Sequence, residues 1–137
     1  MPSEFGELKI RGIHHIGVVV DDLAAAETFL ARTLGLNKVA ETEQADLKAS
    51  FFDCHGTQIE VIEISDPIAR SVRLGSEQAR IEHIALIVDD LDDAVATLGE
   101  CSVKTRQPSD GRRTAWTQAE TSDGVMYQFV EGSEPDR

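Results

Sequence analysis

The chain repeats a short motif at a fixed interval, and this repeat is the feature that most constrains its fold. Residues 15–23 read HIGVVVDDL and residues 83–91 read HIALIVDDL, an offset of 83 − 15 = 68 residues. The same offset, 124 − 56 = 68, relates residues 56–63, GTQIEVIE, to residues 124–131, GVMYQFVE. Two matches at one offset indicate a duplicated module, with each copy filling about half of the 137 residues.

Both copies show the same predicted order of elements, which is strand, helix and three strands. Short apolar, β-branched runs mark the strands, and aspartates directly before Leu23 and Leu91 are typical helix N-caps. In the first helix, the predicted apolar face consists of Leu23, Ala26, Phe29, Leu30 and Leu34. The predicted strands are 12–20, 38–43, 47–53, 57–64, 81–88, 102–106, 114–119 and 125–130, and the main helices are 23–34 and 91–98.

This pattern predicts an α+β chain built from two tandem βαβββ modules within a single domain, residues 1–137. Module one covers residues 11–64 and module two covers residues 80–131. A polar linker, residues 65–79, joins them and contains a short predicted helix from Pro67 to Arg73.

Charge and apolar content exclude several classes of partner. Asp and Glu number 25 against 13 Lys and Arg, and the net charge of −12 argues against nucleic acid and anionic membranes. The sequence has no apolar run near the ~18 residues of a spanning helix, and its first residues do not resemble a signal peptide. Cys54 and Cys101 show no motif spacing, so we expect reduced thiols in a cytoplasmic protein.

Four polar residues occupy equivalent positions in the two copies. His15 corresponds to His83 and Glu60 to Gln128, and each pair of residues within a copy is separated by 45 positions. Each of the four lies in the first or last predicted strand of its module, among apolar neighbours. If the modules pack about a pseudo-twofold axis, the four side chains can converge. Two imidazoles, a carboxylate and an amide oxygen form a plausible site for a divalent ion such as Zn, Fe, Co, Ni or Mn.

At these residues the chain resembles the vicinal oxygen chelate superfamily, which includes glyoxalases, extradiol dioxygenases and antibiotic-binding proteins. The resemblance covers residues 11–131 and rests on HIGVVV with Asp22-Leu23, on QIEV at 58–61, on EHIA at 82–85 with VDD at 88–90, and on residues 124–131. It implies a cup-shaped mixed β-sheet around a metal, with His15, Glu60, His83 and Gln128 as the ligands.

Within the superfamily, the chain is most similar to the methylmalonyl-CoA epimerases, in length and in residues 63–70, EISDPIAR. That subgroup commonly has Gln as the second ligand and Glu as the fourth, whereas Glu60 and Gln128 stand in the reverse order here. The resemblance implies a homodimeric epimerase or isomerase that removes a proton next to a carbonyl through a metal-stabilised enolate. Its substrate would be an acyl-CoA or another small carbonyl compound.

Glu60 is the only carboxylate among the four residues, so it is the first candidate for the catalytic base. Glu43 is the second, because it loosely matches the base of the epimerase subgroup. Alternative functions are a glyoxalase I-type lyase, an epimerase of a sugar- or cyclitol-like compound, an Fe(II) dioxygenase and an antibiotic-binding protein. Four other residues receive simpler interpretations. We expect Glu63 and Arg73 to be solvated charges, and Phe51 and Trp116 either to pack in the core or to form walls of the site.

Overall fold

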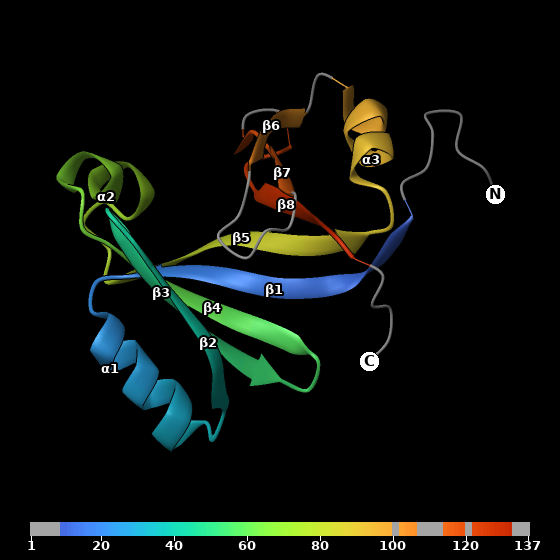
Figure 1. Cartoon of the computed structure of the whole chain (residues 1–137). Helices are drawn as coiled ribbons and strands as arrows, with labels where there is room; N and C mark the ends of the chain where they lie inside the picture. The colour runs from blue at the N-terminus through green and yellow to red at the C-terminus, as the bar shows by residue number, and fades with distance from the viewer. Residues whose placement is uncertain (1–8, 100–101, 107–113, 120–121, 133–137) are drawn as a thin grey trace. The chain divides into compact units, whose positions relative to one another are not determined.

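A computed structural model describes residues 9–99, 102–106, 114–119 and 122–132 (Figure 1). The chain divides into two compact units. One unit is His15–Glu82, and the other combines Met1–His14 with His83–Arg137. No helix in the described part of the chain is long and apolar enough to cross a membrane.

The first unit contains a four-stranded mixed sheet with helices on both faces. Its strands are ordered β2-β3-β4-β1, with β1 and β4 parallel and the other two pairs antiparallel. The elements are β1 (Ile10–Val20), of which residues 10–14 belong to the other unit, α1 (Leu23–Thr28), a π-helical turn η1 (Phe29–Thr33), β2 (Asn37–Gln44), β3 (Leu47–Cys54), β4 (Thr57–Ile64) and α2 (Pro67–Arg73).

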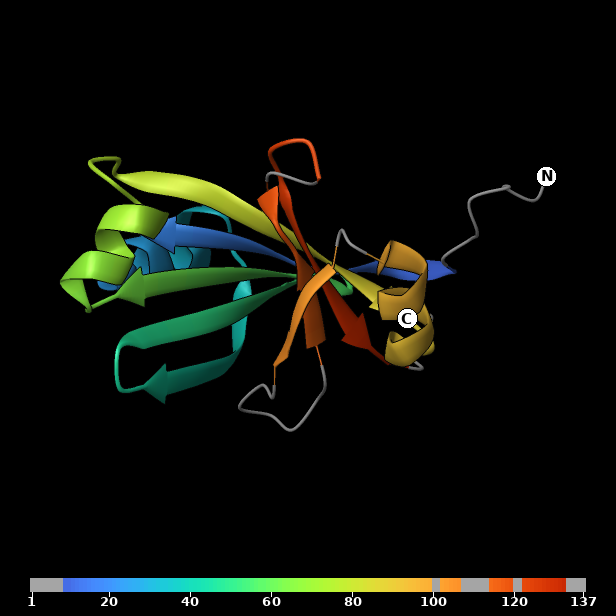
Figure 2. The ribbon, with the colours of Figure 1, turned by 90° about the horizontal axis from the view of Figure 1, so that it is seen from above.

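The second unit repeats this topology. Its sheet has the order β5-β8-β7-β6, again with the first and last strands, β5 and β8, parallel and the other pairs antiparallel (Figure 2). The predicted α+β class with two βαβββ modules is therefore confirmed. The elements are β5 (Ala79–Val88), α3 (Leu91–Leu98), β6 (Ser102–Arg106), β7 (Thr114–Thr117) and β8 (Met126–Glu131).

The two units also repeat individual hydrogen bonds at their helix N-termini. Asp22 caps α1 by accepting from the Ala25 N–H, and Asp90 caps α3 by accepting from the Asp93 N–H. A second acceptor comes from the last strand. Leu23 N donates to Glu63 Oε1 at 2.8 Å, and the equivalent Leu91 N donates to Glu131 Oε2 at 3.0 Å. Glu63 is thus a helix-capping residue and not the solvated charge that the sequence suggested.

Alternation along the strands separates two apolar layers on the first sheet. Residues of one parity pack under α1 and η1, and residues of the other parity pack under Leu74, which follows α2 and is 1% exposed. The predicted linker, residues 65–79, is therefore not separate from the module, because its residues Ala69 and Leu74 pack against the sheet. The α1 layer comprises Val20, Leu23, Leu30, Phe52 and Val61, and the α2 layer comprises Val19, Ala49, Ile62, Ile64 and Leu74.

The first helix differs from its prediction in its second half. Its last turn is π-helical, with Leu34 N donating to Phe29 O, and such a turn holds one more residue than an α-turn. Leu30 is buried, while Phe29 and Leu34 are each 52% exposed. The placement of Phe29 and Leu34 on the core face is therefore wrong. Phe29 lies six residues after Leu23, which is about 240° around a regular α-helix, and Leu34 is rotated off the face by the extra residue of the π-helical turn.

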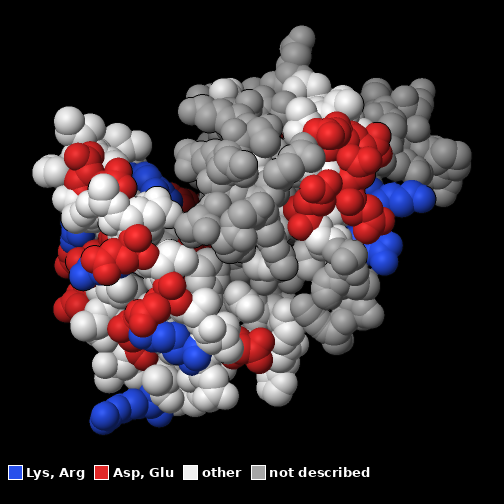
Figure 3. All heavy atoms as spheres, viewed as in Figure 1, with Lys and Arg blue, Asp and Glu red and all other residues white. Residues whose placement is uncertain are grey.

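Acidic side chains gather around the start of α3, where Figure 3 shows carboxylates on the face drawn. They are the exposed residues Asp89, Asp90, Asp92 and Asp93. The helix N-terminus favours this negative charge, and Arg11 Nη1 lies 3.3 Å from Asp89 Oδ2 within the same unit. Cys54 is a free thiol, and Cys101 lies outside the described residues.

Removing either capping glutamate should destabilise the fold. We expect Glu63→Ala and Glu131→Ala each to lower the free energy of unfolding by about 1–2 kcal/mol, because a helix N–H loses a charged acceptor. Urea unfolding measures the change, and Glu77→Ala, at an exposed position, is the control. Equal stability of the Glu63→Ala and Glu77→Ala proteins would contradict the capping role.

A second stability prediction concerns pH. The Ser50 hydroxyl donates a hydrogen bond to Glu27, and Lys38 Nζ lies 3.0 Å from the same carboxylate. The Ser50 hydrogen bond, followed by Lys38, holds the pKa of Glu27 below its usual 4.5. A lowered folded-state pKa contributes stability above the unfolded-state pKa and loses it as the pH falls through the folded-state value.

The stability lost in Ser50→Ala should therefore be largest above about pH 5 and should shrink below about pH 4. Denaturant unfolding of Ser50→Ala and the unmodified protein between about pH 3 and pH 7 measures this difference. A difference that stays constant over the whole range would mean that the Glu27 charge is not involved.

Candidate metal centre

His15 and Glu60 lie side by side in the first unit. His15 Nε2 is 3.2 Å from Glu60 Oε1, and their side chains are 6% and 15% exposed. Two ligands of one zinc-like ion at bond lengths of about 2.0–2.2 Å lie about 3 Å apart when the angle between them is near 90°. The observed pair therefore has the spacing of adjacent ligands of a single ion.

The pairing of β1 with β4 explains why these two residues meet. In this parallel pair, Glu60 is the register partner of Gly17, and His15 is two residues before Gly17 on the same face. Gly17 has no side chain to fill the space beside the carboxylate. On the other side of β4, Phe51 of β3 is the register partner of Glu60, and its ring is edge-on to His15 with centroids 5.6 Å apart.

The second unit has the equivalent arrangement around His83. His83 of β5 is 2% exposed, and Gln128 of β8 is 9% exposed. Gln128 has two register partners, the small residue Ala85 on β5 and Trp116 on β7. The Trp116 ring is edge-on to His83, with centroids 4.8 Å apart and an interplanar angle of 72°. Each unit thus combines a histidine, an oxygen-bearing side chain, a small residue and an aromatic ring.

Gln128 provides an independent indication of a ligand. Its Oε1 is buried and accepts no hydrogen bond from the part of the chain that the structure describes. A buried amide oxygen without a partner costs about 1–3 kcal/mol, so such atoms are rare in folded proteins. A cation beside Gln128 would satisfy this oxygen, and the residue therefore fits its predicted role.

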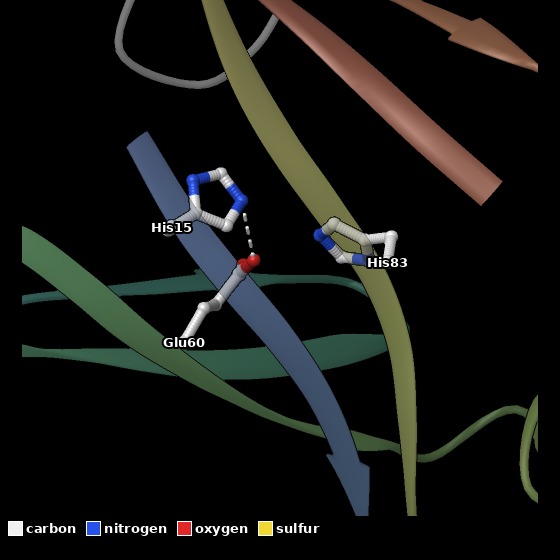
Figure 4. Close-up of side chains that lie close together, drawn as sticks. All are labelled: His15, Glu60 and His83. Carbon is white, nitrogen blue, oxygen red and sulfur yellow. Dashed lines mark ion pairs between the residues drawn. The ribbon is translucent and has the colours of Figure 1, made fainter. Parts of the chain in front are cut away.

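His15, Glu60 and His83, drawn in Figure 4, are a group of residues of the kinds that hold a metal ion. Neutral imidazoles and a carboxylate suit Zn, Fe, Co, Ni and Mn, so this buried cluster could hold a divalent ion. Sequence analysis named all three residues. The complete four-residue ligand set and the identity of the base stay predictions.

Glu43, the second candidate base, lies away from this cluster. It is exposed on β2, where its register partner is Lys48. Strand alternation places Glu43 and Lys48 on the face that carries α1, and Glu60 and Phe51 on the face that carries α2. Of the two candidates, the structure places only Glu60 beside a histidine.

An arginine–glutamate pair joins the last residue of α2 to the start of β5. Arg73 Nε and Nη2 donate to the two oxygens of Glu82 at 2.7 and 2.8 Å, and the Glu82 side chain is 8% exposed. The pair raises the pKa of Arg73 above its usual value, chiefly through the Glu82 hydrogen bond, with smaller contributions from the charges of Glu60 and Asp46. Arg73 is therefore part of a bidentate ion pair and not the solvated charge that helical spacing suggested.

Comparison with known proteins identifies the family. Residues 14–120 match the model of the Glyoxalase/Bleomycin resistance protein/Dioxygenase superfamily, and the chain belongs to this superfamily. The uncharacterized protein YwkD of Bacillus subtilis is 30% identical over 111 residues, which cover 76% of this chain and 85% of YwkD.

Solved structures share the fold at lower identity. Methylmalonyl-CoA epimerase from Mycobacterium tuberculosis is 22% identical, with a TM-score of 0.81 over 98% of this chain and 94% of the epimerase. A variant of the Streptomyces coelicolor methylmalonyl-CoA epimerase in complex with 2-nitronate-propionyl-CoA is 20% identical, with a TM-score of 0.78 over 92% of this chain and all of that one (100%). The expected superfamily and fold are thereby confirmed.

Replacing Gln128 by methionine should separate metal binding from folding. Methionine has a similar volume but no amide oxygen, so we expect Gln128→Met to stabilise the metal-free protein by about 1 kcal/mol. The same change should weaken divalent-ion binding, because a ligand is lost. Urea unfolding in chelator and Co²⁺ titration measure the two effects. Unchanged Co²⁺ affinity in Gln128→Met would remove Gln128 from the ligand set.

Proposed function

We propose that this protein is a divalent-metal-dependent epimerase or isomerase that acts on a carbon next to a carbonyl group. The observation that carries the proposal is the buried His15–Glu60 pair, 3.2 Å apart, in a superfamily fold shared with methylmalonyl-CoA epimerases. The buried Oε1 of Gln128, which accepts no hydrogen bond from the described residues, supports the proposal. The substrate would be an acyl-CoA or another small carbonyl compound, and the expected homodimer stays a prediction.

The donor set determines what a bound ion can contribute. A divalent ion at these residues would stabilise the negative charge that develops on a carbonyl oxygen when the neighbouring C–H bond breaks. Among His15, Glu60, His83 and Gln128, only Glu60 carries a negative charge when the imidazoles are neutral. The ligand set therefore leaves a divalent ion with net positive charge toward the substrate.

Glu60 would accept the substrate proton. A carboxylate can accept a proton at neutral pH, whereas the amide of Gln128 has no useful basicity. The low exposure of Glu60 keeps competing water away from its oxygens. With His15 Nε2 and Glu60 Oε1 as ligands of the ion, the second carboxylate oxygen of Glu60 would be the one that takes the proton.

A second candidate function follows from the same cluster. Two histidines and one carboxylate also form the facial triad of Fe(II) oxygenases, and His15, Glu60 and His83 match that composition. The two functions differ in an observable way. An isomerase exchanges a substrate proton with solvent anaerobically, whereas an oxygenase consumes O₂ and requires Fe(II).

The test is metal-dependent exchange of substrate protons with D₂O, screened over small 2-oxo, 2-hydroxy and acyl-CoA compounds. We expect Glu60→Gln to retain part of its metal but to lose exchange by about 10²-fold, because the amide cannot take the proton. Glu43→Gln is the matched control and should exchange at the normal rate, since Glu43 is exposed on the opposite face.

Absence of metal-dependent exchange in the unmodified protein with every compound would contradict the proposal. Full metal content and full exchange in Glu60→Gln would leave Glu60 as a ligand only. Loss of exchange in Glu43→Gln instead would transfer the role of base to Glu43.

A further inference from the structure

In both units an aromatic ring lies edge-on to the site histidine. The ring of Phe51 is at 89° to that of His15, with centroids 5.6 Å apart. The ring of Trp116 is at 72° to that of His83, with centroids 4.8 Å apart. Edge-on aromatic pairs at these distances are attractive beyond simple burial, because the positive edge of one ring meets the negative face of the other.

The two aromatic residues occupy the same position in the fold but not in the sequence repeat. Phe51 is the register partner of Glu60, and Trp116 is the register partner of Gln128. Their separation, 116 − 51 = 65, differs from the repeat offset of 68 because the chain lengths between the strands differ. An aromatic ring at this position in both units, in spite of the changed spacing and residue type, points to a requirement of the site.

We propose that Phe51 and Trp116 are positioning residues that fix the imidazole rings of His15 and His83 for metal binding. The torsion that turns an imidazole about its Cβ–Cγ bond has broad energy wells, so strand geometry alone does not fix the ring. A ring packed edge-on restricts this rotation and keeps the nitrogen directed at the ion. The inference rests on the proposed metal site and specifies how the chain orients two of its ligands.

Ordinary core packing is the competing explanation, and the chain contains a matched control for it. Phe52 follows Phe51 on β3, is 1% exposed and packs in the α1 layer on the opposite face of the sheet. Phe52→Leu and Phe51→Leu remove the same ring from the same strand. Only Phe51→Leu removes it from His15.

The experiment uses Co²⁺ as the probe, with its affinity measured by competition with a chelator and its visible spectrum as a signature of ligand geometry. We expect Phe51→Leu and Trp116→Leu to raise the Kd for Co²⁺ roughly 3- to 10-fold and to alter the spectrum. The aromatic replacements Phe51→Tyr and Trp116→Phe should stay within about 2-fold of the unmodified protein. Phe52→Leu should lower the urea midpoint while leaving the Kd and the spectrum unchanged.

Trp116 offers a second readout, since it is the single tryptophan of the chain. Its ring contacts His83, so Co²⁺ bound there should quench its fluorescence. In Phe51→Leu, the quenching at saturation should persist but should require more Co²⁺. This shift reports His83 occupancy without any assay of activity.

Unchanged Co²⁺ affinity and spectrum in Phe51→Leu and Trp116→Leu would overturn the inference, as would an equal loss of affinity in Phe52→Leu. If Phe51→Leu does not fold, Trp116→Leu decides the question from the other unit. Failure of the unmodified protein to bind Co²⁺ would overturn both this inference and the proposed function. Normal binding with unaffected leucine variants would overturn this inference alone.

Discussion

Parallel pairing of the first and last strands of each unit is the constraint on which the site depends. Parallel strands cannot be joined by a tight turn, so β1 and β4 require a long connection, which here consists of α1, η1, β2 and β3. The register pairs Glu60 with Gly17, and it therefore places Glu60 on the same face as His15, two residues before Gly17. The crossover also brings Glu63, at the end of β4, to the N-terminus of α1, where it caps the helix.

The two units keep this geometry but differ in the chemistry at equivalent positions. Glu60 and Gln128 both offer an oxygen, but only Glu60 offers a charge. Burying a second carboxylate would add a desolvation penalty and repulsion between like charges. With an amide at the second position, the proposed site would gain a fourth donor, its second oxygen, without further negative charge. The cost is the orphaned Oε1 of Gln128, a local loss of stability that a bound cation would offset.

Sequence reasoning predicted the order of the elements and all three residues of the buried cluster, because the repeat preserved both the apolar strands and the histidines. It did not predict the exposure of Leu34, because a π-helical turn changes the helical period without a local signal in the sequence. It left the roles of Phe51 and Trp116 open, since their equivalence appears only in the strand register. The helix-capping role of Glu63 could have been found, because Glu131 repeats it at the common offset.

The single carboxylate also limits the stereochemistry that the site can support. Inverting a carbon requires proton removal on one side and proton return on the other, and therefore two groups on opposite sides of the substrate. Glu43 lies on the other face of its sheet from Glu60, and Asp53, which shares the Glu60 face by alternation, accepts a hydrogen bond from Gly56 N at 3.4 Å. With Glu60 as the proposed base, an isomerisation needs only this one group, which would remove the proton and return it to an adjacent atom on the same side. An epimerisation would need a second group that returns the proton on the opposite side of the substrate.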